Sequence, residues 1–190
     1  MLHLLDESLE AYLRAIVPLP QRDVDVVFEA PDGDWAAGVS RPTVDLYLWD
    51  IRPNVSEREY GEEIVAKPDG RRVRRDPLPR VDCRYLVTAW TTEVRDEHSL
   101  LGNVLTALLL HPIVAAEHLQ GPFADVRPLP RVTLRSGDGT ENSDFWSALG
   151  GQLKPGLDIV VTATIDAALT VVTGPPVAEL HPQVVGFDGP

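Results

Sequence analysis

The chain has 190 residues, a single cysteine and a formal net charge of −12. This length fits one domain that buries a core of its own, and one cysteine excludes a disulfide within the chain and fits a reducing compartment. The excess of acidic side chains argues against general nucleic-acid binding, which relies on Lys and Arg to neutralise phosphates.

The sequence predicts a soluble, cytoplasmic protein. Its opening residues, MLHLLDESLE, carry acids where a signal peptide carries basic residues. The longest strongly apolar run, Val104 to Leu110, is far shorter than the ~18 residues that a membrane span needs. We therefore expect no membrane span.

Charge is spread unevenly along the chain. Residues 1–50 carry a net charge of −7, residues 71–95 one of +4, and residues 136–190 one of −6. The basic middle of one copy could meet the acidic ends of another in head-to-tail contacts that close a ring. The alternative is that these segments are simply solvated faces and loops.

The first forty residues predict a helix, a strand and a turn. Leu2 to Ile16 has the leucine spacing of one apolar helical stripe, and the prolines that follow end it. Asp23 to Ala30 alternates apolar and polar residues, which is typical of a strand with one wet face near a sheet edge. Pro31 to Asp34 reads as a turn. It lacks the spaced ligands of a calcium loop.

Two apolar runs are expected to form the centre of the sheet. Arg41 to Asn54 and Val81 to Thr91 each alternate with apolar or aromatic residues on both faces. A strand of this kind is covered on both sides. We expect the two runs to lie next to each other.

Between these runs, residues 62–75 predict a hairpin around a Pro-Asp-Gly turn. Its second half carries four arginines. They could form a solvated arm or a docking surface for an acidic protein. A phosphate or nucleic-acid site is the least favoured interpretation, because no aromatic residues lie between the arginines to stack on bases. These arginines are Arg71, Arg72, Arg74 and Arg75.

Asp96 to His111 predicts the main helix, so rich in leucine that it should be buried nearly all round, in the core or against another subunit. Gly102 within it costs up to about 1 kcal/mol against alanine, and a close crossing with a strand would explain that cost. Pro112 is expected to open a short helix over Ile113 to Leu119.

The remaining chain predicts a strand over Arg131 to Arg135, a short helix from Asn142 or Ser143 to Leu149, and a strand over Leu157 to Ile165. Leu169 to Thr173 adds one more strand. We expect residues 173–190 to be an extended tail after a domain that spans residues 1–172.

No residue pattern in the sequence supports catalysis or a cofactor. Cys83 lies within an apolar strand and is expected to be an inert buried thiol rather than a nucleophile. His98 reads as a solvated histidine, and His111 and His118 lack the carboxylates of a known metal pattern. Neither a phosphate-binding glycine loop nor a nucleophile elbow is present.

Four blocks in order carry a family resemblance: PTVDLYLWDIRPN, DPLPRVDCRYLVTAW, EHSLLGNVLTALL and DFWSALGGQLKPGLDIVVT. Together they cover roughly Leu5 to Ile165 and resemble the cap (tail-terminator) proteins of contractile injection systems. The resemblance implies a non-enzymatic structural protein without cofactors. It would form a ring, usually hexameric, on the last layer of inner tube and sheath at the end distal to the baseplate.

The resemblance also implies which residues matter. Contacts with other subunits, the tube or the sheath are expected at Arg52, Asn54 and Arg58, just past a strand end, and at the four arginines of the hairpin. Six copies would carry a formal charge of about −72, so we expect such a ring to repel DNA and to assemble in a salt-dependent way. Packing roles are expected for Trp49, Tyr85, Trp90, Leu101, Gly102 and Trp146.

The fold class that follows is α+β: one domain with a mixed, mostly antiparallel sheet flanked by about four helices, similar to tail terminators. Two other functions stay open. One is an assembly chaperone or adaptor that dimerises through its C-terminal tail. The other is a monomeric ligand-binding domain or small enzyme with a pocket near Cys83 or His98.

Overall fold

The computed structural model describes residues 1–19, 23–61, 63–66, 69–135, 146–150, 153–166 and 171–172. The chain divides into two compact units. We call Met1–Glu59 with Leu78–Ala167 the main unit, and Tyr60–Pro77 with Ala168–Pro190 the hairpin unit. Among the described residues, none of the helices combines the length and the apolar composition needed to cross a bilayer.

The main unit is built on a five-stranded mixed sheet in the order β1-β2-β5-β7-β6. β1 pairs with β2 in parallel, and the other neighbours are antiparallel. The predicted mixed, mostly antiparallel sheet is therefore confirmed, as is the pairing of the two apolar runs, which form β2 and β5. The strands are β1 (Asp25–Val27), β2 (Thr43–Pro53), β5 (Arg80–Trp90), β6 (Arg131–Leu134) and β7 (Gly156–Thr164).

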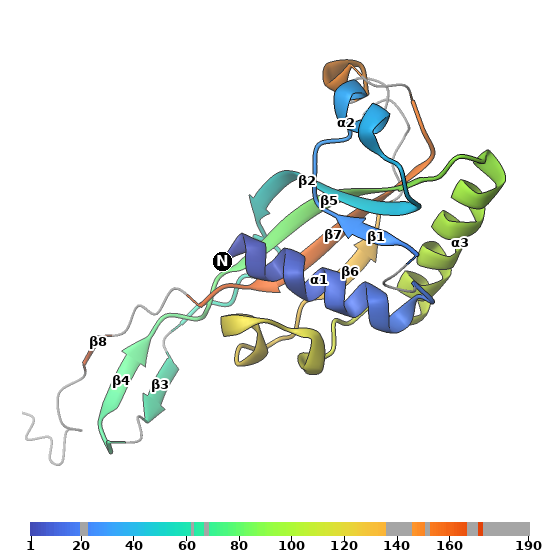
Figure 1. The fold of residues 1–190 in the computed structure, drawn as a ribbon. Helices are drawn as coiled ribbons and strands as arrows, with labels where there is room; N and C mark the ends of the chain where they lie inside the picture. The colour runs from blue at the N-terminus through green and yellow to red at the C-terminus, as the bar shows by residue number, and fades with distance from the viewer. Residues whose placement is uncertain are drawn as a thin grey trace, which may run out of the picture. The chain divides into compact units, whose positions relative to one another are not determined.

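Three α-helices accompany this sheet: α1 (Leu2–Ile16), α2 (Gly33–Gly38) and α3 (Val94–Leu110). α1 lies across one face of the sheet, and α3 stands at one end of it (Figure 1). Residues 146–149 are also helical and lie beside α2, where a Cβ on Gly33 would come 3.8 Å from the Gly150 carbonyl oxygen.

Two local predictions are wrong in detail. The expected turn at Pro31–Asp34 instead begins α2, because Asp32 Oδ1 accepts a hydrogen bond from the Trp35 N–H at 2.8 Å and caps the helix. The helix expected after Pro112 is limited to a 3₁₀ turn, η1 (Ala116–His118), because the backbone around Ile113 pairs with β6. A second 3₁₀ turn, η2 (Gly121–Ala124), follows.

The hydrophobic core lies between α1, α3 and one face of the sheet. α1 contributes Leu5, Leu9, Tyr12 and Leu13, while α3 contributes only Val104, Ala107 and Leu108. The strands supply alternate residues, as the period of two requires. The core residues of β2, β5 and β7 are Val44, Leu46, Cys83, Tyr85, Val87, Ile159, Val161 and Ala163.

The opposite face of the sheet changes character along β2 and β5. At one end Asp45, Leu86 and Thr88 are fully or almost fully buried. Beyond a register shift between Leu48 and Asp50, the same face becomes polar and more open. We call that polar part the open sheet face.

The hairpin unit contains a three-stranded sheet in the order β3-β4-β8, all antiparallel. β3 (Glu63–Ala66) and β4 (Arg72–Arg75) form the predicted hairpin, and β8 (Val171–Val172) is the described part of the strand expected at residues 169–173. The predicted extended tail, residues 173–190, and the start of the predicted helix at Asn142 or Ser143 lie outside the described residues.

Candidate interaction surfaces

The open sheet face carries a ladder of alternating charges across three strands. Arg84 on β5 lies 3.9 Å above the ring of Trp49 and donates from Nη2 to Asp158 Oδ2 at 2.8 Å. Asp50 Oδ2 lies 2.7 Å from Arg52 Nε and 3.9 Å from Arg84 Nη1, and both contacts are ion pairs. The register shift at Trp49 places it on this face together with Asp50. Because both signs alternate, the ladder is locally close to neutral.

The sequence analysis named Trp49 and Arg52 among the residues of this ladder but missed Arg84 and Asp158. The available signal was that the apolar strands β2, β5 and β7 carry charged residues of both signs where apolar residues would fit. Only the strand register, which aligns Asp50 with Arg84 and Arg84 with Val160, shows that they meet.

We expect the Arg84→Met substitution to lower the free energy of unfolding by about 2 kcal/mol, because it leaves two partly buried carboxylates without their shared cation. Arg52→Met is the matched control: the Arg52 side chain is 70% exposed, against 7% for Arg84, so its loss should change stability by less than about 0.5 kcal/mol. Urea unfolding of both variants tests this. Equal losses would show that the ladder does not depend on Arg84.

Asn54, predicted as a contact residue, is buried and bonded within its own chain. Its Nδ2 donates to Asp82 Oδ1 at 3.0 Å, and its Oδ1 accepts from Ser56 Oγ and the Glu57 N–H, both at 2.9 Å. Asp82 Oδ1 also accepts from Thr162 Oγ1 at 2.7 Å. Asn54 therefore fixes the turn after β2 to the sheet, and its contact role stays a prediction.

The turn after β2 presents the other two predicted contact residues at the surface. Arg52 lies within β2, next to its last residue, and Arg58 lies in the turn beyond it; both are exposed. Glu57 next to them bridges Arg80 and Arg131, which ties the turn to β5 and β6. These ion pairs hold the turn in place. The exposed arginines Arg52 and Arg58 beside it form a basic surface, which we call the basic corner.

The four hairpin arginines belong to the other unit. Arg71, Arg72 and Arg74 are exposed and Arg75 is half-buried, while Val73 between them is buried. Arg72 and Arg74 share one face of β4, since alternate residues of a strand point the same way. The hairpin thus presents a compact basic surface, and its contact role stays a prediction.

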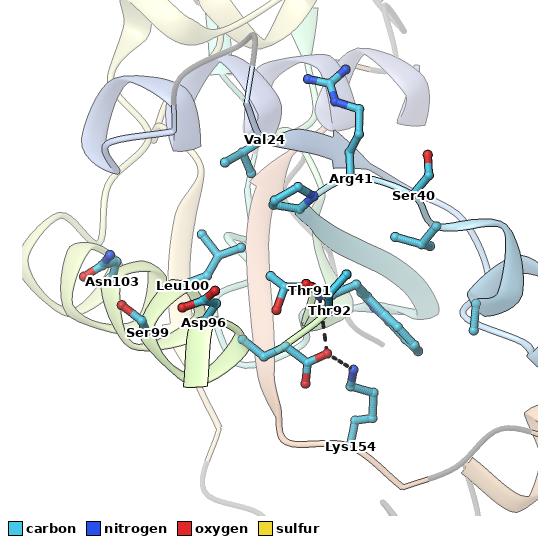
Figure 2. Close-up of a pocket in the computed structure, with 15 residues that line it drawn as sticks. Val24, Ser40, Arg41, Thr91, Thr92, Asp96, Ser99, Leu100, Asn103 and Lys154 are labelled. Atoms are coloured by element: carbon cyan, nitrogen blue, oxygen red, sulfur yellow. Dashed lines mark hydrogen bonds and ion pairs between the residues drawn. The ribbon is translucent and has the colours of Figure 1, made fainter. Parts of the chain in front are cut away.

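A hollow of about 430 Å³ lies between α2, the end of β5 and the first turns of α3 (Figure 2). Lys154 forms an ion pair with Glu97 there, and its Nζ lies 4.0 Å from the centre of the Trp90 ring. The centres of the Trp35 and Trp90 rings are 5.2 Å apart. Thr91 N–H also donates to Glu97 Oε1 at 3.3 Å. These contacts join four segments of the chain around the Trp90 ring.

The remaining residues predicted to pack are mostly inside the fold. Tyr85 is fully buried and donates from its hydroxyl to Asp6 Oδ1 at 2.8 Å, and burial raises its pKa. Trp146 is buried, and Leu101 is half-buried. Gly102 is the exception. It is exposed, and a Cβ built on it would meet nothing within 4 Å.

Because a Cβ on the exposed Gly102 would meet nothing within 4 Å, no close crossing within the described chain requires a glycine there. We therefore expect Gly102→Ala to raise the free energy of unfolding by about 0.5–1 kcal/mol through helix propensity. Gly121→Ala is the contrasting variant. Its φ of +56° and a Cβ only 2.8 Å from Leu4 Cδ1 should make the change destabilising. Thermal melts of both variants give the two signs, and a loss of stability in Gly102→Ala would contradict this account.

Within this chain only one side of α3 is buried, and the predicted burial of its other side against another subunit stays a prediction. Leu109 and Leu110 are 63% and 69% exposed, and Ile113 just beyond the helix is 46% exposed. Composition alone predicted burial, but only one side of this helix faces the core. An apolar surface of this kind on one short segment marks a site of association.

Cys83 and His98 are the residues that the sequence analysis considered for chemistry. Cys83 is fully buried, and burial raises the pKa of its thiol to about 12, which keeps it protonated and unreactive. His98 is exposed on α3. Within the described ranges, no three His, Cys, Asp or Glu side chains gather as a metal site would require.

Comparisons with known proteins agree with this geometry. The model of the Pvc16 N-terminal domain family matches residues 3–179. Among solved structures, the chain is similar to a PVC sheath/tube terminator of an extracellular contractile injection system, with 22% identity, a TM-score of 0.71 and coverage of 98% of this chain and 64% of that one. It is also similar to an anti-feeding prophage tube-terminating cap, with 20% identity, a TM-score of 0.66 and coverage of 95% and 60%. The chain thus spans less than two thirds of either neighbour, and no curated protein sequence matches it.

Proposed function

Because the chain belongs to the Pvc16 N-terminal domain family, we propose that it is a structural cap of a contractile injection system. In this role it forms a ring, expected to be hexameric, at the end of the particle distal to the baseplate. The ring binds the last layer of inner tube and sheath and ends their polymerisation. Assembly of the ring is expected in the cytoplasm.

The observation that carries this proposal is the fold. Its likeness to a sheath/tube terminator and to a tube-terminating cap extends over nearly the whole chain, with TM-scores of 0.71 and 0.66. A few shared helices or strands would not give TM-scores of this size over 98% and 95% of the chain.

A cap of this kind works by shape and surface chemistry, without a reaction. One face of the ring must match the growing end of the tube or sheath, and the other face must offer nothing to which another layer can bind. The exposed basic corner with Arg52 and Arg58, and the arginines of the hairpin unit, are the charged surfaces available for acidic partners.

The test is a polymerisation assay with the tube and sheath proteins of the same system. Added in increasing amounts, the cap should shorten the tubes and label one end of each in electron micrographs. Tubes of unchanged length and unlabelled ends would overturn the proposal. Binding to single unpolymerised subunits without any effect on tube ends would instead favour the assembly chaperone or adaptor.

Light scattering at low salt and at 0.5 M salt tests the remaining alternative, a monomeric ligand-binding domain. A mass near six chains, falling as salt is raised, is expected for a ring held partly by charge. A monomer at every salt concentration that also fails to bind tube or sheath would favour the ligand-binding domain, with the hollow between α2 and α3 as its site.

A further inference from the structure

Two exposed arginines lie along β6, at one edge of the main sheet. Arg131 begins this strand and Arg135 follows its last residue. The register pairs Arg131 with Thr162, and the Arg135 N–H donates to the Asp158 carbonyl oxygen at 2.8 Å. Both arginines therefore stand on the open sheet face, because residues directly opposite each other in a ladder share a face. Arg131 forms an ion pair with Glu57, whereas Arg135 has no ion-pair partner among the described residues.

An apolar segment adjoins these arginines. Ile113 pairs with Arg131 in an isolated bridge and is 46% exposed. Leu109 and Leu110, the last two residues of α3, come shortly before it and are exposed as well. We call this edge, with its two arginines and Ile113, the β6 edge. Contact surfaces between proteins typically combine an apolar centre with a polar rim, and the β6 edge has both kinds of side chain.

The opposite edge of the same sheet is acidic. β1 is the strand at that edge. Asp23 before it and Glu29 after it are exposed, and Asp25 within it pairs with Arg41 at 3.2 Å. In the part of the chain that the structure describes, no cation pairs with Asp23 or Glu29. We call these three acids the β1 edge.

The two edges are too far apart to neutralise each other within one chain. In the sheet order β1-β2-β5-β7-β6 they are four strand spacings apart, which is roughly 19 Å. They are also offset along the strands. Through β2, β1 aligns with residues 88–90 of β5, whereas through β7, β6 aligns with residues 82–85. Their opposite charges can meet only when one copy of the chain lies beside another.

The two edges are complementary in charge rather than alike. A two-fold contact joins the same surface on both subunits, and here it would set arginines against arginines or acids against acids. A head-to-tail contact joins two different surfaces and can close into a ring. We propose that a second copy of this chain binds the β6 edge through its own β1 edge. The closed ring rests on the proposed capping function, while the pairing of these two edges is the new inference.

Charge reversal tests the pairing. Arg135→Glu should weaken self-association at least about fivefold, and so should Asp23→Lys combined with Glu29→Lys, because each variant sets like charges against each other. All three substitutions together restore opposite charges at the contact and should recover most of the wild-type affinity. Arg135→Lys keeps the charge and is the matched control. Light scattering over a range of concentrations at low salt measures association, with tube and sheath proteins present where assembly requires them.

The rescue separates the pairing from an effect of net charge. The variant with two added lysines is less negative than the wild type, so net charge alone would make it associate more strongly. Circular dichroism checks that each variant is folded, which we expect because all three side chains are exposed. Unchanged association of either variant, or no recovery when the substitutions are combined, would overturn the pairing.

Two further outcomes separate this inference from the function. If Arg135→Glu assembles as the wild type does but no longer labels tube ends, the β6 edge binds tube or sheath, and the pairing is wrong while the capping function stands. If the wild type neither associates nor caps tubes, both the pairing and the proposed function are overturned.

Discussion

The free energy of unfolding should fall as pH rises from 5 to 8, and most of this loss should disappear in the Asp45→Asn variant. Asp45 on β2 is completely buried, and one of its carboxylate oxygens, Oδ2, has no hydrogen-bond partner among the described residues. Its Oδ1 accepts from the Glu29 N–H at 3.1 Å. Burial raises the pKa of this carboxyl to about 8, against 3.8 for the ordinary group, and the nearby Glu29 charge adds to the rise.

The sign follows from proton binding. Between pH 3.8 and about 8 the folded chain holds a proton on Asp45 that the unfolded chain has lost. Stability therefore falls by about 1.4 kcal/mol per pH unit in this window and levels off above it. Carboxylates that are paired in the fold make stability rise with pH in the acid range. The contribution of Asp45 must therefore be separated from theirs by substitution.

Urea unfolding at several pH values measures this effect. Asn keeps the oxygen that accepts the Glu29 N–H but does not ionise, so the difference in stability between wild type and Asp45→Asn should change by several kcal/mol from pH 5 to 8. The Asp34→Asn variant, at an exposed acid, controls for the loss of one negative charge. Parallel curves for wild type and Asp45→Asn would contradict a proton held at this position.

The strands were predictable where periodicity and burial agreed. β2 and β5 alternate cleanly and pair as expected, and α1 has the predicted bounds because its apolar stripe is regular and prolines follow it. α2 was missed because Asp and Gly favour a turn as readily as a helix start. Only the Asp32 hydrogen bond to the Trp35 N–H distinguishes the two.

The surfaces were less predictable, because exposure depends on tertiary packing. The leucines of α3 predicted burial in the core or against another subunit, but only the structure shows that the core covers the side with Val104 and Leu108. The place of Asn54 after a strand predicted a contact residue, and the sequence did not show that its amide also fixes the turn. The Arg84 ladder and the buried Asp45 depend on strand register and on coverage of one sheet face, which no local pattern encodes.

Replacing Leu109 and Leu110 together with lysine should weaken self-association at least about 30-fold while the fold remains intact. Both side chains are more than 60% exposed, so their removal leaves no cavity in the core. Lysine near a helix C-terminus is favoured by the helix dipole, so α3 itself should not be destabilised. At a subunit contact of the proposed ring, however, each lysine would replace an exposed apolar anchor, and the loss of a central apolar anchor typically costs about 2 kcal/mol or more.

The matched control is Leu153→Lys. Leu153 is 67% exposed, as these leucines are, but it lies on the segment before β7, beside the first turns of α3 rather than its end. Light scattering over a range of concentrations, and end-labelling of tubes where assembly requires them, measures the change. If the α3 variant associates as well as the wild type, or if Leu153→Lys is equally impaired, the α3 face is not the subunit contact. If the α3 variant unfolds at lower urea, its leucines serve the fold rather than the assembly.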